Sequence, residues 1–365
     1  MLYKIFWQRS KWILLFAGLA IIASFYLQAT DVVKDWHQSN EYYHSKEFNQ
    51  YFKETPEVFL SNFKKGSTKE DFIRYNLTLH LADDSLYFRN KNDLAHADLL
   101  YYYHSTSSMP LWFKIMCFLT LGFVTFFVDL KTRFNQYLFT LNVKKSRLFS
   151  QKVLFFSGFI LAATLLGCIL AQIILYTSIP NEYMNATFIQ AIYSIFSTTL
   201  TYFTLYIIGL VLGAVLGHMI LGPISIVLTF YYLLIMLPLL PGKVNYYLST
   251  LQFMPSFYGL HPYLLVLLIL AIVCGLLLAY YSFNHTSLEE NGSYILAPKL
   301  RLPIFLLMSV GTSLLLIYGY IREQILVAES HEIFLYLLFI WGISIFLVYH
   351  QTIIKKWRIS REKRT

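Results

Sequence analysis

The chain has 365 residues, of which 57% are hydrophobic, 18% aromatic and only 13% charged. A soluble domain carries about a quarter charged residues, so this composition excludes an ordinary soluble protein and predicts an integral membrane protein. The formal charge of +9 does not indicate nucleic-acid binding, because the basic residues stand beside apolar runs and form no groove-sized patch.

The first apolar run, 12–29, follows three basic residues. Such a run is either the core of a signal peptide or an uncleaved first span. It is long for a signal peptide, and its last residues make a poor small-x-small cleavage site. We therefore expect it to be the first transmembrane helix.

Eight apolar runs reach about the length that crosses the hydrocarbon of a bilayer. They predict an all-α, polytopic membrane protein with about eight transmembrane helices. Glycine and proline between the fourth and fifth runs indicate a tight turn. The expected spans are 12–29, 111–129, 153–177, 188–216, 223–240, 263–283, 303–320 and 333–350.

The distribution of basic residues predicts the orientation. More than half of the 29 lysines and arginines fall in segments that eight spans would place on one side. Because cytoplasmic segments carry the excess of Lys and Arg, both termini are expected in the cytoplasm. These segments are the N-terminus, the loop 130–152, the loop that holds Lys299 and Arg301, and the basic tail 351–365.

The segment 30–110 is the one sizeable polar part and predicts a small extracellular helical domain. Pro56 indicates a helix start and Gly66 its stop. Ser67 and Glu70 have the spacing of a capping box ahead of a further helix. A core of this size is marginal alone, so we expect it to lean on the outer ends of the spans or on a partner.

The loop 130–152, between the second and third spans, is short, basic and amphipathic. The plain interpretation is a positive-inside loop whose cations touch anionic lipid. The alternative is a docking element, whose apolar side chains enter a groove while cations fix its orientation. The residues expected to form this coupling loop are Arg133, Phe134, Leu138, Leu141, Val143, Lys145, Arg147 and Phe149.

Small residues repeat every fourth position in two spans, and such ladders let helix backbones approach closely in lipid. They indicate either static packing within the chain, which is the commoner case, or a moving interface. The residues are Ala163 and Gly167 in the third span and Gly209, Gly213 and Gly217 in the fourth.

The segment 241–262 is half-polar and interrupted by prolines. It predicts either a re-entrant outer segment lining a protein cavity or an aromatic-rich loop on the lipid interface. The candidates for an outer gate within it are Pro241, Pro255 and Tyr258.

The sequence lacks the motifs of an enzyme. It has no phosphate-cradling P-loop, no H-E-x-x-H, no paired Cys-x-x-Cys and no nucleophile elbow, so we expect no catalytic residue, no metal and no cofactor in this chain. Apart from Asp129 and Lys114, which are terminal in their spans, no Asp, Glu, Lys or Arg lies at mid-depth in a span, which argues against proton- or sodium-coupled transport. The three cysteines all fall in apolar runs, so no disulfide framework is expected, which favours a bacterial surface over a eukaryotic secretory one.

The order of these parts over 1–285 resembles the permease subunits of ABC-2 type bacterial exporters. The first residues resemble the amphipathic elbow helix of that family, here 1–11. Thr140 to Lys145, followed by Leu148, Phe149 and Lys152, is similar to its coupling-helix motif, although Asn142 stands at the family proline and Lys145 at its arginine. Glu290 and Gly292 resemble the E-x-G turn of Gram-positive, Ytr-like members.

The resemblance implies core helices over 111–285, two additional spans over 286–350 and a bacterial plasma-membrane location. It implies an export subunit that works as a homo- or heterodimer with a second permease and with separate P-loop ATPases, which bind the ATP and Mg²⁺. The expected cargo is an amphipathic peptide, an antibiotic or an envelope lipid. The alternative is a non-transporting membrane sensor or scaffold whose ectodomain binds an envelope ligand.

Overall fold

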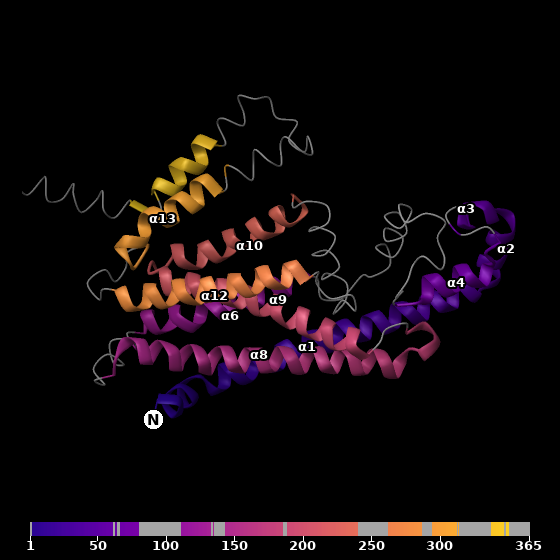
Figure 1. Cartoon of the computed structure of the whole chain (residues 1–365), viewed down its shortest axis with the longest axis horizontal. Helices are drawn as coiled ribbons and strands as arrows, with labels where there is room; N and C mark the ends of the chain where they lie inside the picture. Colours follow the sequence, from indigo (N-terminus) through magenta and orange to yellow (C-terminus); the bar gives the residue numbers. More distant parts are fainter. Residues whose placement is uncertain are drawn as a thin grey trace, which may run out of the picture.

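The computed structural model describes residues 2–60, 63, 66–79, 111–132, 134, 143–184, 188–239, 262–286, 294–311, 313, 337–346 and 348–349. Over these residues the regular structure is helical, and the only pairing between extended segments that is recorded there is an isolated antiparallel bridge of Leu216 with Ile295. The all-α class expected from the sequence is therefore confirmed (Figure 1).

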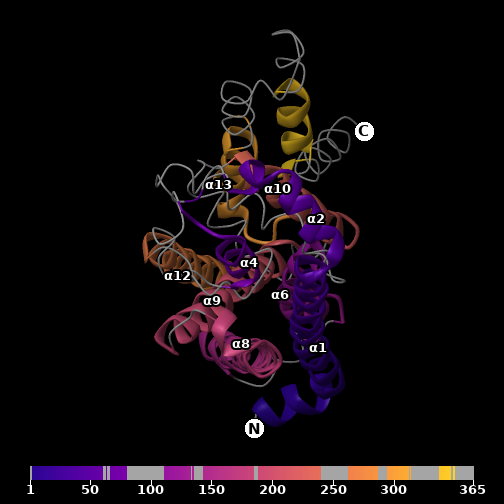
Figure 2. The ribbon, with the colours of Figure 1, turned by 90° about the vertical axis from the view of Figure 1, so that its right-hand side faces the viewer.

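Helix α1 runs without interruption from Leu2 to His44. The expected elbow 1–11, the span 12–29 and the start of the polar segment thus belong to one helix. No proline occurs in this stretch, so nothing in the backbone forces a break. Figure 2 shows the first turns of α1 inclined to the rest of the helix. The helix ends at His44, and the hydroxyl of the next residue, Ser45, accepts a hydrogen bond from Phe48 N and caps α2 (Lys46–Glu54).

Four further helices form a bundle with α1. They are α6 (Leu111–Lys131), α8 (Lys145–Ser178), α9 (Phe188–Val215) and α12 (Pro262–His285). Helix α1 packs along α8, while α6 packs along α9, which also contacts α8 and α12. Helices α1 and α8 begin, and α6, α9 and α12 end, at the same end of the bundle, called the N-terminal end below (Figure 1).

These five helices are long and apolar enough to cross a membrane. Helix α10 (Leu221–Leu239) falls on the fifth expected span. The last two expected spans are described in part, as α13 (Arg301–Leu306), a π-helical turn (Leu307–Gly311) and the apolar helix Leu337–Phe346. Figure 1 shows α13 and Leu337–Phe346 on the side of α10 that faces away from α1 and α8.

A separate aromatic cluster lies at the far end of α1, beyond the bundle (Figure 1). It is built by α2, α3 (Pro56–Leu60) and α4 (Lys69–Leu77) around the buried side chains of Phe48, Phe52 and Phe72. Leu175 and Ile179, at the end of α8, belong to the same cluster. The cluster therefore rests on the far ends of α1 and α8.

The cap of α4 is displaced from the expected position. Thr68, not Ser67, is the N-cap, and it forms a reciprocal capping box with Asp71. Either pair satisfies the spacing rule, but a start at Thr68 places Phe72 and Ile73 in the buried cluster. Gly66 precedes the cap with a positive φ of 93°, a conformation that glycine adopts without strain.

Candidate functional site

The N-terminal end of the bundle holds the described part of the expected coupling loop. Arg133, Leu138 and Leu141 lie outside the described residues. The other expected loop residues, Phe134, Val143, Lys145, Arg147 and Phe149, are described and divide into two groups. Arg147 is exposed, as is Lys144, whereas Phe134 and Val143 pack against the bundle core.

Phe149 lies inside the bundle and does not project from it. Its ring stacks on Phe126 of α6 at 5.4 Å and lies 5.5 Å and 5.6 Å from Tyr280 and Phe283 of α12. Only 5% of Phe149 is exposed. The start of α8 is thus joined to α6 and α12 by an aromatic box of these four rings.

A buried ion pair lies one turn further along α8. Lys152 Nζ is 2.6 Å from Asp129 Oδ2, and the lysine side chain is fully buried. The Lys152 ammonium also lies over the ring of Phe126, 4.2 Å from its centroid. A buried charge pair contributes little net stability, because the cost of desolvation offsets the attraction, but removing one partner is costly because the other charge is left unpaired in a low-dielectric environment.

The same aspartate reaches α1. Arg9 Nη2 lies 3.1 Å from Asp129 Oδ1 and donates a hydrogen bond to Thr132 Oγ1. The guanidinium covers the ring of Phe134, 3.8 Å from its centroid. Arg9, Asp129 and Lys152 are called the basic clamp below. One carboxylate therefore connects three helices that are distant in sequence.

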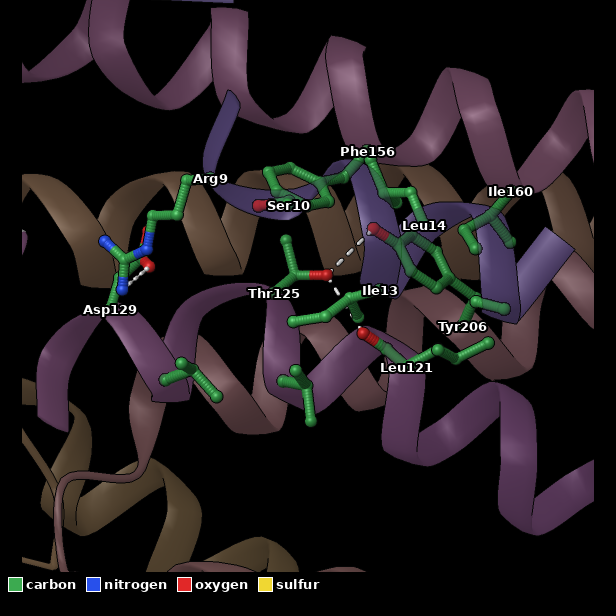
Figure 3. Close-up of a pocket in the computed structure, with 13 residues that line it drawn as sticks. Arg9, Ser10, Ile13, Leu14, Leu121, Thr125, Asp129, Phe156, Ile160 and Tyr206 are labelled. Atoms are coloured by element: carbon green, nitrogen blue, oxygen red, sulfur yellow. Dashed lines mark hydrogen bonds and ion pairs between the residues drawn. The ribbon is translucent and has the colours of Figure 1, made fainter. Parts of the chain in front are cut away.

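A crevice opens beside the basic clamp, between α1 and α6 (Figure 3). It has a volume of about 70 Å³. Its floor carries Tyr206 of α9, whose hydroxyl is 3.2 Å from Thr125 Oγ1. Thr125 donates to the carbonyl of Leu121, so the tyrosine is the donor between the two hydroxyls. Arg9, Ser10, Thr125 and Asp129 give one end of the crevice a polar lining.

Two contacts tie the remaining segments of this end together. Lys145 Nζ donates to the carbonyl oxygen of Thr286, at the end of α12, over 3.2 Å. The extended segment from Tyr294 to Ala297 is buried against the end of α9, where Gly217 N donates to Tyr294 O and Leu296 N to Val215 O. Burial raises the pKa of the Tyr294 phenol, whose oxygen is 2.8 Å from Ser225 Oγ.

The small residues of the ladders lie where two helices of the chain pack closely against each other. A Cβ on Gly209 or Gly213 would overlap the carbonyl oxygens of Leu119 or Phe123 of α6, and one on Gly167 would lie 2.7 Å from the ring of Phe25. Ala163 is buried beside Gly18 of α1. Gly217 differs from the expectation: it follows the end of α9 and pairs with Tyr294, so it is not part of the ladder.

Lys114 is a second buried cation, far from the basic clamp. It donates to Gln28 Oε1 of α1 and lies over the ring of Phe25. Among the described residues, no carboxylate forms an ion pair with it. Gln172 of α8 is also buried, with both amide atoms lacking a hydrogen-bond partner among the described residues.

The sequence did not predict the basic clamp. The sequence pattern indicates Lys152 only as a cation at the end of the loop 130–152 and Asp129 only as the last residue of the span 111–129. The available signal was a single carboxylate at the end of one apolar run and a lysine at the start of the next, since charges at such depth are expected to pair. Pro241, Pro255 and Tyr258, the candidates for an outer gate, lie outside the described residues.

At the N-terminal end of the bundle, ion pairs and aromatic contacts connect the helices. Within the described residues, no three of His, Cys, Asp and Glu gather as metal ligands would. Comparison with known proteins finds no family model, no curated protein and no solved structure that matches the chain. The family resemblance therefore stays a prediction.

Proposed function

We propose that this chain is the membrane subunit of an ATP-binding cassette exporter whose ATPase is a separate polypeptide. The observation that carries the proposal is the basic clamp: both ends of the basic loop between α6 and α8 are held by one buried carboxylate that also binds α1. Movement of the start of α8 is therefore coupled through Asp129 to α6 and α1.

The proposed movement starts at the exposed cations. Lys144 and Arg147 stand at the start of α8 and are exposed, so they can meet an acidic groove on an ATPase. When ATP closes the ATPases, the loop is pushed toward the membrane. The ATP and Mg²⁺ are held by that partner.

Force on α8 has two routes into the bundle. Phe149 carries it through the aromatic box to α12, and Lys152 carries it through Asp129 to Arg9 and α1. The hydrogen bond of Lys145 to Thr286 couples the loop to α12 a second time. In this proposal Phe149 and Lys145 transmit movement, while Lys144 and Arg147 contact the partner.

The rest of the proposal follows the sequence. The chain lies in a bacterial plasma membrane with both termini in the cytoplasm, and it pairs with a second permease, identical or homologous. The cargo is an amphipathic peptide, an antibiotic or an envelope lipid, which connects the complex to antibiotic resistance. The span count of about eight and the extracellular position of α2 to α4 belong to the same proposal.

Copurification with a P-loop ATPase tests it. The variant Lys144→Glu with Arg147→Glu is expected to lose the ATPase and ATP-driven export, because it reverses the charge of the exposed contact while leaving the basic clamp untouched. The matched control Lys46→Glu with Lys53→Glu changes the same charge in α2, at the other end of α1, and should keep both.

Retention of the ATPase and of export by the Lys144 and Arg147 variant would overturn the coupling role. A different change distinguishes an exporter from the alternative, a non-transporting sensor. An exporter loses its function when the Walker lysine of the partner ATPase is replaced, whereas a sensor keeps its response.

A further inference from the structure

The crevice between α1 and α6 has the composition of a lipid-binding site. Because α1 packs along α8 and α6 along α9, the two helices leave a gap that α8 and α9 close from behind. Its walls are apolar over most of their length. They are formed by Ile13, Leu14 and Ala17 of α1, Leu121, Val124 and Val128 of α6, and Phe156 and Ile160 of α8.

One end of the crevice is cationic. The basic clamp contains two cations and one anion, so it carries a net charge of +1 beside the hydroxyls of Ser10 and Thr125. Arg9 uses Nη2 for its contacts with Asp129 and Thr132, and its side chain is 27% exposed. A guanidinium has five N–H donors, so Arg9 retains donors for an additional oxygen anion.

The mouth of the crevice lies on a helix face that is apolar and exposed. Trp12, Ile13 and Phe16 of α1 are 65%, 57% and 71% exposed, and α1 is apolar enough to cross a membrane. Arg9 stands just before this apolar stretch, which is the position of a headgroup-level residue. Lipid is therefore the molecule that meets the opening.

We propose that the crevice binds an anionic phospholipid from the leaflet at the N-terminal end of the bundle. Its phosphate lies against Arg9 and Ser10, and one acyl chain enters between Leu14 and Ala17 on one side and Val124 on the other. The volume of about 70 Å³ holds a segment of a single chain. The lipid proposal does not rest on the proposed transport function, although the site shares Arg9 and Asp129 with the basic clamp.

Charge, not apolar area, sets the lipid preference. The surrounding lipid tails are as apolar as the crevice walls, so the walls alone favour no particular lipid. Among the described residues, Asp129 is the only carboxylate that lines the crevice, and it is already shared by Arg9 and Lys152, so it is not available to a cationic headgroup. Lys4 and Lys11 on the same helix add to the attraction of an anionic one.

Native mass spectrometry of the full chain, released from bilayers that contain equal amounts of phosphatidylglycerol and phosphatidylcholine, tests the proposal. We expect retained adducts to be enriched severalfold in phosphatidylglycerol. Ala17→Leu fills the crevice and should abolish the enrichment. Ala20→Leu makes the same change three residues away, on the exposed face of α1, and should leave it unchanged.

The headgroup contact has its own pair of variants. Arg9→Gln should lose the preference, while Arg9→Lys keeps the charge and should retain most of it. Val124→Phe fills the crevice from the α6 side and replaces Ala17→Leu if that variant fails to fold. Equal enrichment in the wild type and in a folded crevice-filling variant, or no preference for phosphatidylglycerol in the wild type, overturns the proposal.

Discussion

Lys152 and Asp129 form an ion pair of 2.6 Å across the two ends of the loop that joins α6 and α8. Arg9 approaches the other oxygen of the same carboxylate at 3.1 Å. A single aspartate thus neutralises one fully buried cation and holds a second, half-buried one. The arrangement makes Asp129 the residue on which the N-terminal end of the bundle depends.

Replacing Asp129 should therefore be costly. In Asp129→Asn, Lys152 remains buried without a counterion, and we expect a loss of about 3–5 kcal/mol in the free energy of unfolding. The double variant Asp129→Asn with Lys152→Met removes both charges and should recover most of the loss. Thermal unfolding of the purified chain in detergent measures both.

Glu57→Gln is the control for the loss of a carboxylate, because Glu57 is exposed in α3. It should unfold at the temperature of the wild type. A double variant no more stable than Asp129→Asn would mean that packing around the aspartate, and not the unpaired lysine, causes the loss.

Two glycines, Gly209 in α9 and Gly158 in α8, predict opposite effects for the same substitution. Gly209→Ala places a methyl group on the carbonyl oxygen of Leu119, and overpacking of this kind costs about 1–3 kcal/mol. Gly158→Ala meets no atom within 4 Å and should raise stability by about 0.5–1 kcal/mol, because alanine loses less conformational entropy in a helix. The free energies of unfolding of the two variants, measured in detergent, compare the two effects. Equal effects would contradict the close packing of α9 on α6.

Much of the fold follows from the length and composition of the apolar runs. A run of 18 residues or more has few alternatives to a helix in lipid, because every backbone donor must be satisfied within the segment. The ends of helices are less determined. Nothing between Leu2 and His44 stops a helix, so the elbow, the span and the polar continuation that the composition separates became one element.

The candidate site was predictable in part. Basic residues mark the loop between α6 and α8, but amphipathic spacing could not tell which apolar side chains point outward, and Phe149 turned inward onto Phe126 and Phe283. The basic clamp depends on the approach of α1 to α6 and α8. Such a contact between distant segments leaves no trace in local periodicity.

Lys114 should behave differently from Lys152. Its cation is buried without a carboxylate among the described residues, and its hydrogen-bond partner is Gln28. Lys114→Met leaves the amide of Gln28 unpaired, at a cost of about 1–3 kcal/mol. Adding Gln28→Leu removes that penalty, and the double variant should equal or exceed the wild type in stability. A double variant that stays clearly less stable than the wild type would show that the buried contact of Lys114 with Gln28 contributes net stability.

The cap of α4 predicts a loss of local structure in acid. The backbone and side-chain hydrogen bonds from Thr68 lower the pKa of Asp71 below its ordinary value. A carboxylate with a lowered pKa in the folded state stabilises the fold above the unfolded pKa of about 4, and this contribution disappears as the pH falls through the folded value. The fluorescence of Trp36, whose indole donates to Leu77 O at the end of α4, should report the release of α4 in a chain where Trp36 is the single tryptophan.

Asp71→Asn removes the titrating group of the cap. At neutral pH, the Trp36 fluorescence of this variant should already resemble the fluorescence that the wild type shows in acid. The fluorescence of the variant should then change little as the pH falls. Glu70→Gln removes an exposed carboxylate that takes no part in the cap, so its acid transition should match that of the wild type. If Asp71→Asn shows the same acid transition as the wild type, a group other than Asp71 causes it, because Asp71 is the residue that accepts the reciprocal bond from Thr68 N.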